Sequence, residues 1–187
     1  MSAHLPSNGT RPRVRKSGRP EATRSAVPVL EALKALIAAQ PFFKGMKEEH
    51  LQTLAESAME IQFTAGQVIF REGDLANRFY LIERGKVAVE VERRVAEPIL
   101  LQTLGPGREV GWSWILPPYH EPFTARALEA TEAIFFHGTQ LREQCEQNHD
   151  LGYELMNRMA VVMLHRIQAT RCQLLACHAK RPRQEPA

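Results

Sequence analysis

Residues 105–126, GPGREVGWSWILPPYHEPFTAR, constrain the fold more than any other stretch of the chain. Glycines and prolines recur through this span, and both tryptophans of the protein, Trp112 and Trp114, lie within it. Glycine permits backbone angles that other residues avoid and proline fixes one of them, so the span is neither an ordinary helix nor an ordinary strand. Bulky aromatic rings between such bends are typical of a ligand-facing loop on a rigid scaffold.

The composition predicts one globular domain of ordinary size. The chain has 187 residues, of which 44% are hydrophobic and 24% charged, which is enough apolar material for a single core. No apolar run approaches the ~20 residues of a membrane span, and the N-terminus lacks a signal-like stretch. We therefore predict a cytoplasmic protein without a membrane partner. Three cysteines without a C-x-x-C pair indicate reduced thiols and no metal site.

The basic charge is concentrated at the two ends. The net charge is +3, yet residues 1–26 carry six basic residues against Glu21 alone, and the tail from Lys180 adds three against Glu185. The remaining body is acidic. We predict a disordered basic arm over 1–27 and a basic tail over 179–187. No aromatic residue interleaves the basic ones in the arm, so nucleic-acid binding is only weakly indicated, and a solvated tail without a partner is the alternative.

The middle of the chain changes from a helical to a strand-like pattern. A leucine and isoleucine stripe predicts a helix over 29–39, ended by Pro41, and a second helix follows over 47–58. Apolar residues then alternate with polar ones in short, turn-punctuated runs, around 61–70, 79–82, 87–91, 99–104, 123–128 and 133–136. This pattern predicts a mainly β fold with flanking helices, in which the strands form a small antiparallel roll or sandwich.

Residues 149–178 predict one long C-terminal helix that carries two apolar stripes. The first follows a heptad spacing and consists of Met156, Ala160, Met163, Ile167, Thr170, Leu174 and Cys177. The second consists of Leu151, Leu155, Met159 and Val162. We expect the second stripe to pack on the strands and the first to form a parallel homodimer with a second copy of the helix. The alternative is a single helix packed only on its own strands.

The succession of motifs resembles the cyclic nucleotide-binding domain of catabolite activator proteins and of cyclic-nucleotide-regulated kinases and channels. The motifs are F-x-x-G-x-x-I-F-x-E-G-D over 63–74, F-Y-L-I-x-x-G-x-V-x-V over 79–89, and L-G-P-G over 104–107, followed by the long helix. The resemblance implies a jelly-roll-like β-roll of about eight strands with N-terminal helices over 28–148 and a dimerisation helix over 149–178. It also implies a regulatory, signal-transducing role.

The resemblance also implies that the loop after 104–107 is the phosphate-binding cassette. Gly111 matches its glycine, and residues 124–127 match its closing strand. Two positions depart from the family pattern. Trp112 stands where the family has the glutamate that binds the ribose, and Glu121 stands where it has the arginine that pairs with the cyclic phosphate, or His120 if the loop slips by one residue.

These departures weaken the expected affinity for cyclic AMP and cyclic GMP. A buried phosphate diester requires a cation, which an arginine supplies together with a bidentate geometry, whereas Glu121 repels it. Arg126 compensates only if its side chain points inward, and strand alternation leaves both directions open. The effector is then a cyclic nucleotide or another flat or apolar molecule, or the rings fill the cavity and no ligand binds. The expected ligand-binding residues are Gly111, Trp112, Ser113, Trp114, Tyr119, Thr124 and Arg126.

Two hypotheses on function remain, and neither is enzymatic, because no nucleophile has a base and an orienting acid at a recognisable spacing. The first is a ligand-sensing module whose cassette signals through the C-terminal helix. The second is a ligand-free dimeric scaffold with a vestigial pocket. The helix-turn-helix domain that follows in catabolite activators is absent from these residues. We therefore expect the output to pass through the dimer helix, the basic tails or a separate protein partner.

Overall fold

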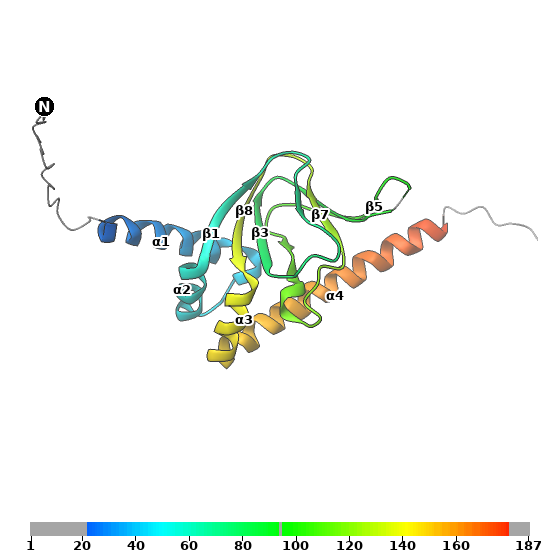
Figure 1. Cartoon of the computed structure of the whole chain (residues 1–187). Coiled ribbons are helices and arrows are strands. Elements are labelled where there is room, and N and C mark those ends of the chain that lie inside the picture. Colours follow the sequence, from blue (N-terminus) through cyan, green and yellow to red (C-terminus); the bar gives the residue numbers. More distant parts are fainter. Residues whose placement is uncertain (1–21, 94, 180–187) are drawn as a thin grey trace, which may run out of the picture.

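The computed structural model describes residues 22–93 and 95–179 (Figure 1). Helices α1 (Ala22–Ala39), η1 (Pro41–Phe43) and α2 (Glu48–Ser57) precede eight strands, and α3 (Gly138–Gln147) and α4 (His149–Ala179) follow them. The predicted fold class, a β-roll with N-terminal helices and a long C-terminal helix, is confirmed. Residues 1–21 of the predicted basic arm and residues 180–187 of the tail lie outside the described residues.

The strands form two antiparallel four-stranded sheets that face each other. One sheet has the order β1-β8-β3-β6 and the other β2-β7-β4-β5. The strands are β1 (Ala58–Phe63), β2 (Val68–Phe70), β3 (Arg78–Arg84), β4 (Val87–Val91), β5 (Ile99–Leu104), β6 (Glu109–Val110), β7 (Thr124–Ala127) and β8 (Thr131–His137). The turn between β3 and β4 requires Gly85, whose φ is +89° and whose added Cβ would collide with the backbone near Ala130.

Strands β3 and β8 are buried on both faces and therefore separate two cores. Tyr80 and Ile82 of β3 point into the roll, whereas Phe79 and Leu81 point toward the helices. This alternation follows from the two-residue period of a strand. A strand that is covered on both sides is apolar at almost every position, which explains the continuous F-Y-L-I run of β3.

The core that lies between the roll and the helices is called the outer core below. Helix α4 packs its predicted apolar stripe against this outer core, as expected. Leu151, Leu155, Met159 and Val162 are all buried there with residues of β3 and β8. Figure 1 shows α4 passing beneath the roll, with α1 and α2 on the side of β1. Beyond Met163 the large apolar side chains Leu164, Ile167, Leu174 and Leu175 are exposed, so the apolar packing of the described part of α4 on the body of the protein is confined to its N-terminal half.

Two features differ from the sequence-based expectation. Helix α1 begins at Ala22 and continues through Pro28, although proline removes one backbone donor from the helix. Within 105–126 the chain forms the short strand β6 and the 3-10 helix η2 (Trp112–Ile115), which are too short to leave a periodic pattern.

Among the described residues, no helix is both long and apolar enough to cross a membrane.

Candidate functional site

The cassette loop begins at Gly111, where the backbone makes a turn that only glycine accepts easily. Gly111 has a φ of +74°, and a Cβ at this position would collide with the backbone carbonyl oxygen of Arg78 on β3. The turn places η2 directly against β3 and directs Trp112 and Ser113 back toward the roll. Gly111 therefore shapes the loop through its backbone, since it has no side chain to contact a ligand.

The cassette encloses a small cavity at the end of the roll. Its volume is about 10 Å³, close to the space that one water molecule needs. Side chains from both sheets, the loop and α4 line it, namely Phe70, Val89, Val110, Trp112, Ser113, Glu121, Phe123 and Arg166. The cavity is too small for a nucleotide in this state of the protein.

Glu121 is the buried acid of this cavity. Its side chain is 4% exposed, and in the described part of the chain its Oε1 atom has no hydrogen-bond partner. Burial raises the pKa of Glu121 from 4.5 to about 7, against a lowering by hydrogen bonding from Ser113. The negative charge of Asp74 raises this pKa further, and the charges of Arg78 and Arg166 lower it. His120, the other candidate for this cassette position, is exposed.

Arg166 brings a cation to the same cavity from α4. Its Nη2 donates a hydrogen bond to the backbone carbonyl oxygen of Glu109 on β6, and its guanidinium carbon lies 6.0 Å from the centre of the Trp112 ring. Burial lowers the pKa of Arg166 to about 10, although the charges of Glu109 and Glu121 raise it. One side chain thus belongs to both the cavity lining and the C-terminal helix.

Arg166 did not emerge from the sequence analysis, although the sequence contains a signal for it. Leu151, Leu155, Met159 and Val162 recur at helical spacing, and the next position of that buried stripe, four residues after Val162, is Arg166. A charged residue that continues a buried stripe is unusual unless a partner receives its charge. Such a residue marks a point where a helix meets a polar site.

The structure directs Arg126 away from the cavity. On β7, Ala125 and Ala127 face the interior of the roll, and Arg126 lies on the opposite face. There its Nε donates a hydrogen bond to Glu90 Oε1 at 2.8 Å. Thr124 shares this outer direction, since its hydroxyl accepts from the backbone N–H of Glu72 and donates to the carboxylate of Glu92. Neither residue lines the cavity.

The remaining predicted aromatic residues, Trp114 and Tyr119, do not line the cavity. Trp114 is 1% exposed and packs in the outer core, with its ring 6.1 Å from that of Phe79. Tyr119 is exposed, and the guanidinium of Arg142 lies over its ring at 4.5 Å. The structure therefore brings Gly111, Trp112 and Ser113 together at the cavity and leaves Trp114, Tyr119, Thr124 and Arg126 outside it. Ligand binding by any of them stays a prediction.

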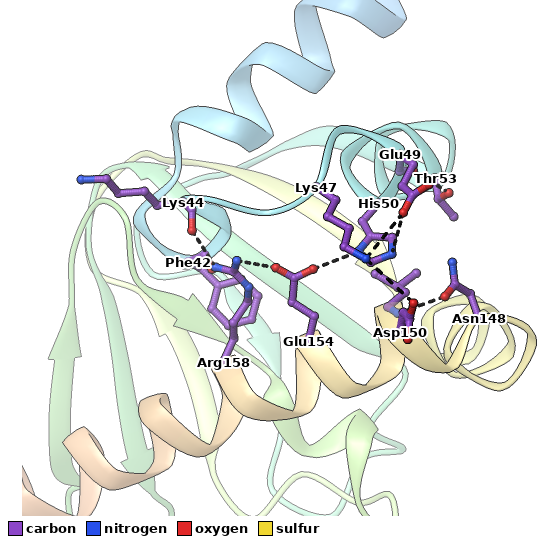
Figure 2. A network of polar contacts seen from close by, with 11 residues as sticks. Phe42, Lys44, Lys47, Glu49, His50, Thr53, Asn148, Asp150, Glu154 and Arg158 are labelled. Atoms are coloured by element: carbon purple, nitrogen blue, oxygen red, sulfur yellow. Dashed lines mark hydrogen bonds and ion pairs between the residues drawn. The ribbon is translucent and has the colours of Figure 1, made fainter.

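A second polar cluster, shown in Figure 2, joins α4 to the N-terminal helices. Glu154 lies between His50 and Arg158. Its Oε2 is 2.8 Å from His50 Nδ1, and its Oε1 accepts from Arg158 Nη2 at 2.7 Å. Arg158 Nη1 also donates to the backbone carbonyl oxygens of Phe42 at 2.6 Å and Lys44 at 3.1 Å. Burial raises the pKa of Glu154, but the hydrogen bonds with Arg158 and His50 outweigh it and hold that pKa below its usual value.

This cluster lies beside a groove of about 560 Å³, which His50, Glu154 and Arg158 help to line. His50 is 1% exposed, whereas Glu154 and Arg158 are half-buried, so the cluster is a partly buried clamp beside the groove. Sequence reasoning missed it because its members come from segments about one hundred residues apart. No group of three or more His, Cys, Asp or Glu side chains suited to a metal ion occurs in the described ranges, and Cys145 is half-buried with a pKa that burial raises.

Comparison with known proteins agrees with the fold. The family model described as "Cyclic nucleotide-binding domain" matches residues 60–148. A crystal structure from Geobacter metallireducens, whose name describes a cyclic nucleotide-binding protein, is 31% identical with a TM-score of 0.63, and the match covers 73% of this chain and 96% of that one.

Two curated relatives match over smaller parts of their length. Acetyltransferase Pat of Mycolicibacterium smegmatis is 37% identical over 43% of this chain and 24% of the enzyme. A CRP-like cAMP-activated global transcriptional regulator of Mycobacterium tuberculosis is 22% identical over 67% of this chain and 56% of the regulator. The chain thus spans about a quarter to a half of these curated relatives. The eight-stranded roll, the cassette and the 96% coverage of the Geobacter protein lead to one conclusion: the chain belongs to the cyclic nucleotide-binding domain family.

Proposed function

We propose that this chain is a non-enzymatic regulatory module that responds to a small effector in the cassette and passes the response to α4. The proposal rests on the location of Arg166, whose side chain lines the cavity while its backbone belongs to α4. A ligand that displaces Arg166 from the cavity has different affinities for two placements of α4, one with Arg166 in the cavity and one with Arg166 withdrawn. Such a difference in interaction free energy is what couples one site to another.

The charges at the cassette oppose the binding of cyclic AMP and cyclic GMP. Glu121, which stands where the resemblance implies the family's arginine if the loop does not slip, lines the cavity. Arg126 is paired with Glu90 on the outer face. A cyclic phosphate therefore loses a charge-assisted hydrogen bond of about 1.5–3 kcal/mol and meets a carboxylate in its place. We infer that the natural effector differs in charge from a cyclic nucleotide.

We expect binding of an effector to change the intrinsic fluorescence of Trp112, whose ring lines the cavity. The measurement is a titration with cyclic AMP, cyclic GMP, cyclic dinucleotides and a panel of small metabolites. Trp112→Phe is the control, because it removes the reporter at the cavity and keeps Trp114 in the outer core. Saturable micromolar binding of cyclic AMP would contradict the inference that Glu121 opposes cyclic nucleotides. Unchanged fluorescence with every compound would overturn the proposed ligand-sensing function.

The output surface that we propose is the heptad stripe of α4, in a parallel homodimer. Met156, Ile167 and Leu174 of this stripe are exposed by 42%, 67% and 57%. Large apolar side chains repeated along one exposed helix face are typical of a surface that a partner covers. A shift of α4 at Arg166 would then change the register or strength of the dimer, or the surface that it presents to another protein.

Ile167→Asp is expected to dissociate this dimer, since it places a charge in the centre of the apolar seam. Sedimentation equilibrium should give about twice the 21.2 kDa chain mass for the wild type and the single-chain mass for the variant. Gln168→Asp adds the same charge at an exposed neighbouring position outside the seam and should remain dimeric. A wild type that is monomeric at high micromolar concentration would show that α4 is not a dimer helix.

The second candidate function is a ligand-free dimeric scaffold, which the small volume of the cassette cavity favours. In that case Trp112, Phe123 and Arg166 fill the space of a former ligand, and the roll serves only to hold α4. The two functions differ in one measurable property. A scaffold dimerises identically with and without every compound of the titration, whereas a sensor changes its dimer affinity when its effector is present.

A further inference from the structure

The geometry points to a ligand of defined chemistry for the cassette: a planar cation with N–H donors and an apolar body, such as a guanidinium or amidinium compound. In this structure the guanidinium group of the protein's own Arg166 lies at the cassette cavity. The inference rests on the proposed function in one respect, namely that the cassette is the effector site. It adds the charge and shape of the effector and names what it displaces.

The first support is the incomplete hydrogen bonding of Glu121. This carboxyl group is almost fully buried, it lines the cavity, and its Oε1 accepts no hydrogen bond from the described residues. A buried acceptor without a donor is unfavourable. A ligand that donates one or two N–H groups in a plane satisfies a carboxylate in the bidentate geometry known for guanidinium groups. A phosphate or carboxylate ligand brings only acceptors to this oxygen.

The second support is the apolar and aromatic wall around the carboxyl group. Phe70, Val89, Val110 and Phe123 line the cavity with the ring of Trp112. Such a wall rejects a strongly hydrated ion but accepts a delocalised, weakly hydrated one whose face stacks on an aromatic ring. An apolar body attached to the cation gains further free energy from the area that it buries.

The third support is that a planar cation is already present. The Arg166 guanidinium lies at the cavity near the Trp112 ring, yet its fit is incomplete. Its Nε is buried without a hydrogen-bond partner among the described residues, and its Nη2 donates to the Glu109 backbone rather than to Glu121. A free ligand of the same chemistry is not tethered to α4 and can face Glu121 directly. Binding therefore exchanges one cation for another and releases the helix.

The surrounding charges are compatible with this exchange. Asp74 and Glu109 add negative charge near the cavity, and Arg78 and Arg108 add positive charge. The Nη1 of Arg78 donates a hydrogen bond to the backbone carbonyl oxygen of Ile69. Once Arg166 withdraws, Glu121 is the ionisable side chain that lines the cavity, so the vacated space is acidic.

The test uses the full chain with Arg166→Ala, which opens the space, and benzamidine as the probe. Benzamide has the same shape without the charge, benzoate has the opposite charge, and cyclic AMP represents the phosphate ligands. We expect benzamidine to bind the variant at least about 10-fold more tightly than benzamide or benzoate, because a charge-assisted pair with Glu121 is worth that factor or more. The wild type should bind benzamidine about 10-fold more weakly than the variant, because Arg166 competes. Calorimetry and Trp112 fluorescence provide the two readouts.

Glu121→Gln in the Arg166→Ala background is the matched control, since it keeps the shape and removes the charge. It should abolish the preference for benzamidine over benzamide. Circular dichroism shows whether the variants fold, and Arg166→Met, which keeps the apolar contacts, replaces Arg166→Ala if the latter unfolds. The inference is overturned if folded variants bind benzamidine no better than benzamide, if Gln at position 121 leaves the preference intact, or if cyclic AMP binds best.

These outcomes separate the inference from the proposed function. Cation-selective binding that leaves the dimer affinity of the wild type unchanged would support the ligand chemistry and contradict the signalling through α4. A neutral or anionic effector that shifts the dimer affinity of the wild type would do the reverse.

Discussion

Glu121→Gln is expected to stabilise the protein above pH 7 by on the order of 3 kcal/mol and to leave its stability nearly unchanged below pH 4.5. The physical reason is that burial raises the pKa of this carboxyl group from 4.5 in the unfolded chain to about 7 in the fold. The folded protein therefore holds a proton that the unfolded chain releases. The favourable contribution of Glu121 is complete below pH 4.5 and is lost as the pH rises through 7.

The measurement is urea denaturation of both proteins between pH 4 and pH 9. The difference between the two curves isolates Glu121, because groups with the opposite dependence, such as Glu154, are common to both. Glu129→Gln, at an exposed position after β7, is the matched control and should run parallel to the wild type. Parallel curves for Glu121→Gln as well would show that this carboxyl group is solvated or paired in solution, and the cassette would then lack its buried acid.

Arg158→Met is expected to lower the free energy of unfolding by about 3 kcal/mol. The side chain makes three hydrogen bonds, two of them to the backbone carbonyls of Phe42 and Lys44 and one to Glu154. Methionine keeps most of the length and the apolar packing but leaves these acceptors without their donor. The loss should appear as a lower urea midpoint, because the clamp joins α4 to the segment between α1 and α2.

The control for this prediction is Arg171→Met, at an exposed position nearer the end of α4. It removes the same charge and should stay within about 0.5 kcal/mol of the wild type. An Arg158→Met protein as stable as this control would mean that the clamp contributes nothing net, as is known for many exposed ion pairs. The N-terminal helices would then be held on α4 by apolar packing alone.

The buried face of α4 and the strands of the roll could be predicted because each depends on a short-range repeat. Leu151 and Leu155 recur at helical spacing, and Phe79 to Ile82 form an apolar run of strand length. Burial of such repeats is favourable in any fold that supplies a facing surface. The short strand β6 and helix η2 were missed because two to four residues are too few for a period to show.

The cassette residues could be predicted in part. Gly111, Trp112 and Ser113 lie at the cavity because a glycine turn and the residues after it form one local unit. Trp114 and Arg126 do not. The direction of Trp114 depends on how η2 packs against β3, and that of Arg126 depends on the register of β7 against its neighbouring strands. A shift of one residue in a strand reverses the face on which a side chain lies, and the sequence of the loop contains no information on that register.

The amino-acid sequence by itself determined the β-roll and the long C-terminal helix, because these are properties of local patterns. It also predicted, through the family resemblance, a cassette in which Glu121 or His120 replaces the family's arginine. Only the tertiary structure decided that Glu121 is buried with its Oε1 lacking a donor among the described residues, that Arg166 reaches the cavity from α4, and that His50, Glu154 and Arg158 form a clamp. Each of these facts joins segments far apart in the chain, as with the 104 residues between His50 and Glu154. Their burial and electrostatic energies exist only once the fold has removed the intervening water.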